Sequence, residues 1–116
     1  MALPYIKNIG RNEILRLPET VDILPGQVVS KTLSQNDALS LTLFAFDKGE
    51  EISAHRSEGD AMITALFGSA TVTVDGKEHI LKTGDTLVMP AGLPHAVKAN
   101  EGFKMFLVVV FPQKSE

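Results

Sequence analysis

The stretch Gly84-Asp-Thr-Leu-Val-Met-Pro90-Ala-Gly92-Leu-Pro-His95 decides the fold of this chain. A glycine precedes a short apolar run, the run ends at a corner of proline and glycine, and a histidine follows the corner. Glycine and proline mark turns, and the aliphatic residues between them favour a strand. A second histidine, His55, follows Gly49 further upstream. Two histidines that are brought together by different strands indicate a site in a small β-protein.

The composition limits the fold and the partners of the chain. With 116 residues, 44% of them hydrophobic, residues 1–116 are expected to form one domain with one core. The 11 Lys and Arg against 14 Asp and Glu leave no basic surface, which disfavours nucleic acid and membranes as partners. Pro4 and Lys7 interrupt the N-terminus before a signal-like run develops, so we expect a cytoplasmic protein. The absence of cysteine leaves histidine and the carboxylates as metal ligands.

Alternating and apolar runs indicate strands along most of the chain. They lie at residues 39–46, 62–67, 70–74, 77–81, 86–89 and 104–111. The pair Asp75-Gly76 predicts a type I′ hairpin, because both central residues of that turn need a positive φ. Residues 1–26 indicate an irregular lead-in, in which 12–17 is the one candidate for a helical turn, ended by Pro18. The chain is therefore expected to be all-β, a sandwich or a barrel, and its length favours a barrel.

The opening stretch resembles the second sequence motif of the cupins, small β-barrels of the jelly-roll type. That motif reads G-x5-P-x-G-x2-H-x3-N, and its final asparagine position falls on Ala99 here. The other four marked positions are filled at the right spacing by Gly84, Pro90, Gly92 and His95. The resemblance runs from about Leu39 to Phe111 and implies a single cupin-type jelly-roll β-barrel that follows the lead-in.

The first cupin motif is matched only in part. It reads G-x5-H-x-H-x3,4-E-x6-G, and Gly49, His55 and Gly68 match it. Ser57 occupies the position of the second histidine, and Ala61 occupies that of the glutamate. The resemblance therefore implies that two of the four usual metal ligands are missing.

His55 and His95 remain the candidate metal ligands and the candidate catalytic residues. Two imidazoles hold a divalent transition metal firmly only if a third donor reaches it. Asp60 is such a donor if a bulge at 58–59 turns it inward. The other candidate donors are Glu50, Glu51 and Glu58. Without a third donor, water or the backbone would satisfy the two histidines.

The resemblance also implies a ligand pocket at the barrel mouth, and Ser57, Asp60 and Ala61 are expected to line it. Its function stays open among three classes, as does the question of whether the chain is an enzyme. The first is binding of a small ligand, with or without a divalent metal. The second is a metal-dependent oxygenase or isomerase acting on a small polar or aromatic compound, and metal-free acid–base chemistry by the two imidazoles is a variant of it. The third is a ligand-sensing module.

A homodimer is expected because cupins commonly dimerise through their N-terminal strands. The lead-in 1–26, the segment 27–33 and the apolar closing strand are the expected contacts.

Overall fold

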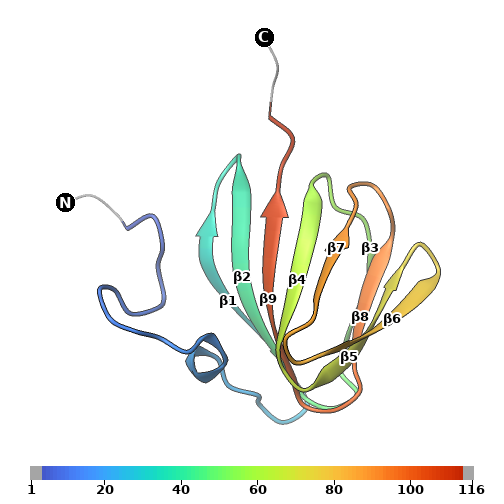
Figure 1. The fold of residues 1–116 in the computed structure, drawn as a ribbon, viewed down its shortest axis with the longest axis horizontal. Helices are drawn as coiled ribbons and strands as arrows, with labels where there is room; N and C mark the ends of the chain where they lie inside the picture. Colours follow the sequence, from blue (N-terminus) through green and yellow to red (C-terminus); the bar gives the residue numbers. More distant parts are fainter. Residues whose placement is uncertain (1–3, 114–116) are drawn as a thin grey trace.

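The computed structural model describes residues 4–113 and confirms an all-β chain. Within these residues, nine strands form two antiparallel sheets, ordered β1-β2-β9-β4-β7 and β3-β8-β5-β6 (Figure 1). The strands are β1 (Val28–Gln35), β2 (Leu39–Phe46), β3 (Glu51–His55), β4 (Asp60–Phe67), β5 (Ser69–Val74), β6 (Lys77–Lys82), β7 (Thr86–Met89), β8 (His95–Ala99) and β9 (Phe103–Val110). This is the jelly-roll arrangement that the sequence predicts. No helix in the described part of the chain is long and apolar enough to cross a membrane.

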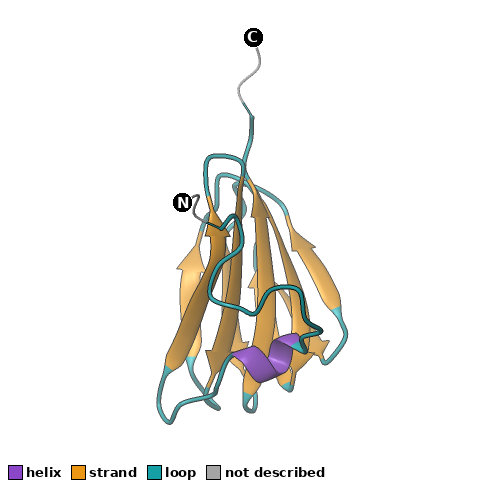
Figure 2. Ribbon diagram, turned by 90° about the vertical axis from the view of Figure 1, so that its left-hand side faces the viewer, coloured by secondary structure: helices purple, strands orange, loops and turns teal. Residues whose placement is uncertain are grey.

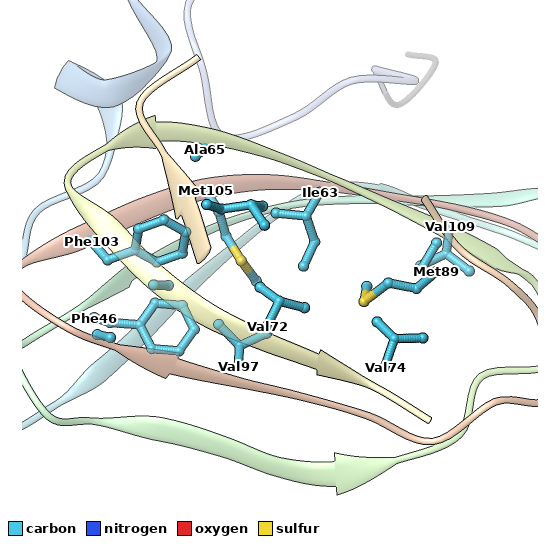
Figure 3. Packing of buried hydrophobic residues seen from close by; sticks show 14 residues of the cluster. Phe46, Ile63, Ala65, Val72, Val74, Met89, Val97, Phe103, Met105 and Val109 are labelled. Atoms are coloured by element: carbon cyan, nitrogen blue, oxygen red, sulfur yellow. The ribbon is translucent and has the colours of Figure 1, made fainter. Parts of the chain in front are cut away.

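The main hydrophobic core lies between the two sheets. Alternate residues of each strand point into it, because successive side chains of a strand face opposite sides. Phe46 on β2 and Phe103 on β9 are opposite each other in the ladder, and their ring centroids are 5.7 Å apart. Valines of β5 and β8, such as Val72 and Val97, meet these rings from the other sheet (Figure 3).

The turn between β5 and β6 confirms the predicted hairpin. Val74 pairs with Lys77, which leaves Asp75 and Gly76 as a two-residue loop. Their φ angles are 48° and 83°, the positive values that a type I′ turn requires. The hairpin fixes the register of β5 against β6 from local sequence alone.

The lead-in covers part of the outer face of the larger sheet, mainly over β1 and β2 (Figure 2). Leu17 and Val21 of this segment pack with Leu43 and Ala45 of β2 in a second hydrophobic cluster. Within its described residues 4–26, the one regular element is the 3-10 helix η1 (Leu17–Thr20). The helical turn expected at 12–17 is thus wrong in position. The observed turn begins at Leu17 and includes Pro18. A proline is tolerated in the first turn, where its missing N–H needs no partner.

Most of the segment 27–33, an expected dimer contact, belongs to β1, and β1 pairs with a strand of its own chain. β1 runs antiparallel to β2, with Val28 opposite Phe46, and a register shift lies between Thr32 and Ser34. Its other edge has no strand partner among residues 4–113. The structure therefore leaves one free edge on this strand.

Candidate functional site

A cavity of about 190 Å³ lies between the two sheets and contains both candidate histidines. Strands β2, β3, β4, β7, β8 and β9 all contribute to its wall. Apart from His55 and His95, the lining side chains are apolar: Phe44, Ile52, Ile63, Met89, Val97, Met105 and Leu107. His95 is only 5% exposed, whereas His55 is exposed and lies at the mouth. The imidazoles are thus the polar end of an otherwise apolar cavity.

A bulge in β3 turns His55 toward the cavity. Ile52 lies opposite Val97, and His55 lies opposite His95, so Ser53 and Ala54 together face Ala96 alone. Strict alternation along β3 would put residues three apart on opposite faces. The extra residue of the bulge restores the parity, and Ile52 and His55 both line the cavity.

The backbone fixes the tautomer of both imidazoles. Nδ1 of His55 lies 3.0 Å from the carbonyl oxygen of Ser53, and Nδ1 of His95 lies 3.3 Å from that of Leu93. A carbonyl oxygen only accepts hydrogen bonds, so each Nδ1 carries the proton. The proton-free Nε2 of each neutral ring is then available as a ligand or a base.

These two Nε2 atoms converge at 3.1 Å, with the ring planes at 68° to each other. Two nitrogen lone pairs at that distance repel unless a proton or a metal cation lies between them. Burial lowers the pKa of His95, the neighbouring His55 lowers it further, and the hydrogen bond to Leu93 partly offsets both effects. The unprotonated form of His95 is therefore favoured near neutral pH, which suits a metal ligand.

The pair fits two neighbouring positions around one metal ion. With metal–nitrogen distances of about 2.0–2.1 Å, a nitrogen separation of 3.1 Å gives an angle of about 100° at the metal. That angle lies between the octahedral and tetrahedral values. However, within residues 4–113 no group of three or more His, Cys, Asp or Glu side chains could hold a metal ion. The remaining positions would have to be filled by water or by a ligand.

Ser57, Asp60 and Ala61 lie outside the lining of this cavity. The Ser57 hydroxyl accepts a hydrogen bond from the N–H of Gly59 at 3.2 Å, and Ala61 is buried in the core opposite Met89. Asp60 accepts a hydrogen bond from the N–H of Ala91 at 2.8 Å. Because β4 starts in regular register at Asp60, no bulge turns that carboxylate inward.

The other proposed third donors also lie elsewhere. Glu58 lines a separate surface pocket together with Asp60, and Glu51 lines a groove on the smaller sheet. Glu50 is absent from the cavity lining as well. Among the described residues, the structure therefore brings His55 and His95 together without a carboxylate.

Hydrogen bonds between two loops hold the histidines close, a feature that the sequence does not reveal. The Arg56 guanidinium donates to the carbonyl oxygen of Gly92 at 2.7 Å, and the Gly92 N–H donates to that of Ser57 at 2.9 Å. Together with the contact between Asp60 and Ala91, they join the connection between β3 and β4 to the loop before His95. No local pattern marks such partners, because they are more than 30 positions apart. The apolar lining, by contrast, follows from strand alternation.

Comparison with known proteins identifies the family. The family model described as "Cupin domain" matches residues 42–111. The chain belongs to the cupin family. This cupin is similar to the crystal structure of a conserved protein of unknown function from Streptococcus pyogenes, with a TM-score of 0.94 and 46% identity. That alignment covers 98% of this chain and 100% of the other.

Two further relatives extend the comparison. A cupin superfamily protein from Desulfitobacterium hafniense has a TM-score of 0.88 and 31% identity, covering 92% of this chain and 98% of that one. A curated relative, quercetin 2,3-dioxygenase of Bacillus subtilis, is 27% identical over 97 residues, which are 83% of this cupin. The match spans only 28% of the length of that relative. The cupin fold is thus established, whereas the relative's activity is not transferred by it.

Proposed function

We propose that this cupin binds a small molecule in the cavity between its sheets and holds a divalent transition metal on His55 and His95. The observation that carries the proposal is the convergence of the two Nε2 atoms at 3.1 Å, at the polar end of an apolar cavity. A site of this kind, apolar with a few convergent polar groups, is typical of small-molecule binding. We place the protein in the cytoplasm.

The chain contributes orientation and shelter to this site. The carbonyl groups of Ser53 and Leu93 hold both rings by their Nδ1 protons, which keeps each Nε2 directed to one point. The apolar wall lowers the local dielectric and so strengthens any charge interaction there. A bound metal would act as a Lewis acid on an oxygen of the ligand.

An oxygenase or isomerase activity is the second candidate. The named activity of the Bacillus subtilis relative favours it, although only two of the four cupin ligand positions hold a metal-binding residue here, His55 and His95. Oxygen uptake by the metal-loaded protein with a bound organic compound would support this candidate. Binding without uptake or change of the compound would leave the protein a binding module.

Protein purified without a chelator is expected to contain about one divalent metal per chain, because the two Nε2 atoms form a preformed pair of ligands. Elemental analysis checks this, and the double variant His55→Ala/His95→Ala should contain none. His79→Ala is the matched control, since His79 lies on β6 outside the cavity lining. Wild-type protein without metal, even after incubation with zinc, would remove the metal from the proposal.

We also propose a homodimer, because apolar side chains are exposed on the outer face of the larger sheet and on the lead-in. Met62, Val88 and Val110 gather on β4, β7 and β9, and Ile14 is fully exposed. Neighbouring exposed apolar side chains on one face support an interface with a second copy of the chain.

Gel filtration with light scattering is expected to give about twice the 12.5 kDa of one chain. Val88→Glu should shift the mass toward the monomer, because a buried charge would be introduced at the interface. Ile80→Glu is the control, since Ile80 is exposed on the other sheet and should leave the mass unchanged. A wild-type mass near 12.5 kDa would contradict the dimer.

A further inference from the structure

We infer that the ligand of this cavity is a compound with a single six-membered ring and one anionic oxygen group, of the size and charge of benzoate or a phenolate. The inference rests on the proposed function, since it concerns the same cavity. It names the chemical class of the ligand, which follows from the size, the lining and the charge of the site.

The size of the cavity limits how much of a ligand it encloses. Drug-sized ligands occupy pockets of about 300–1,000 Å³, whereas this cavity has about 190 Å³. A cavity of about 150 Å³ lined by aliphatic and aromatic side chains accommodates benzene. The space here therefore suits one ring with one small substituent, and a fused pair of rings exceeds it.

The lining favours an aromatic ring over a sugar or an amino acid. Phe44 and the thioethers of Met89 and Met105 give the wall aromatic and sulfur contacts, which stabilise a bound ring. The polar side-chain atoms of the lining are the imidazole nitrogens, and both Nδ1 atoms are already bonded to the backbone. The hydroxyl groups of a sugar would lose their water partners without replacement, at a cost of about 1–3 kcal/mol for each unpaired group.

The polar end of the cavity selects a negative charge. The two Nε2 atoms converge at 3.1 Å, and the divalent metal of the proposed function would give that end a positive charge. A carboxylate or phenolate oxygen complements this charge where the apolar wall excludes water. The ring then lies against the apolar wall with its oxygen at the histidines.

Methyl NMR of protein labelled at the methionine methyl carbons tests this inference. Benzoate is expected to shift the signals of Met89 and Met105, which line the cavity, and to leave Met62 on the outer face unchanged. Glucuronate, which has the same charge without an aromatic ring, should shift none of them. 1-Naphthoate should bind at least about tenfold more weakly than benzoate, because its second ring has no room in a cavity of this size.

A variant with a larger cavity tests the size limit in the opposite direction. Leu107→Ala enlarges the cavity, so the affinity for 1-naphthoate should rise relative to benzoate. Unchanged Met89 and Met105 signals at saturating benzoate would overturn the inference, as would shifts caused by glucuronate. If metal content is still one per chain in that case, the metal site of the proposed function stands and only the ligand class fails. If neither metal nor any of these compounds binds, both fail.

Discussion

Zinc affinity is expected to fall at least about 100-fold when either His55 or His95 is replaced by alanine. Even the partners that merely orient a metal ligand contribute about 10–100-fold to affinity. In the proposed site, each of these histidines would be one of two protein ligands among residues 4–113. Isothermal titration calorimetry near neutral pH, with chelator-treated protein, measures this loss. The effect is large because no carboxylate among residues 4–113 is placed to replace the missing imidazole.

The matched control for both variants is His79→Ala, which removes a histidine outside the cavity lining and should leave zinc affinity unchanged. Circular dichroism and thermal unfolding establish that each variant still folds. His95→Ala is the variant more prone to unfold, because His95 is buried and pairs with Val74 in the ladder of β5 and β8. A folded His95→Ala protein with wild-type zinc affinity would show that the metal binds elsewhere.

Phe103→Ala is expected to lower the free energy of unfolding by about 3–5 kcal/mol, the usual cost of removing a fully buried aromatic side chain. Phe103 is 0% exposed and packs against Phe46 in the main core. Small domains have about 5–15 kcal/mol of stability, so this single change removes a large share of it. Urea unfolding monitored by circular dichroism measures the loss, and the melting temperature should fall by about 10–25 °C.

Phe67→Ala serves as the control for this prediction. Phe67 is 51% exposed on β4, and the ammonium group of Lys104 lies 5.8 Å from its ring centroid. An exposed cation–π contact is worth about 0.5–1 kcal/mol, so the loss should stay within about 1 kcal/mol. Equal losses in both variants would mean that the core between the sheets does not dominate stability.

Local sequence chemistry predicts much of the fold. Asp75 and Gly76 form the expected turn, because their backbone angles depend on the two residues themselves. The runs at 39–46 and 86–89 coincide with β2 and β7. By contrast, β3 escapes strand prediction, since it is short and its side chains are mostly exposed without clear alternation. Its place in the smaller sheet depends on pairing with β8, which lies 40 positions further along the chain.

The candidate site also has a part that the sequence predicts and a part that it does not. The spacing of glycine, proline and histidine in the two motifs singles out His55 and His95, and the structure puts their Nε2 atoms 3.1 Å apart. The resemblance assigned Ser57, Asp60 and Ala61 to the pocket, through their positions in or beside the first motif. β3 ends at His55, however, and the loop after it turns toward the loop before His95. The three residues lie outside the lining of the cavity.

By itself, the sequence determined the all-β class, the turns and the two histidines, because glycine, proline and Asp-Gly pairs act through the backbone of a few adjacent residues. Only the tertiary structure decided the bulge that turns His55 inward, the absence of a nearby carboxylate within residues 4–113, and the size of the cavity. Each of these depends on how strands far apart in the chain are paired and packed. The strands that pair within each sheet come from distant parts of the chain, and so do the side chains that pack between the sheets. No short segment contains that information.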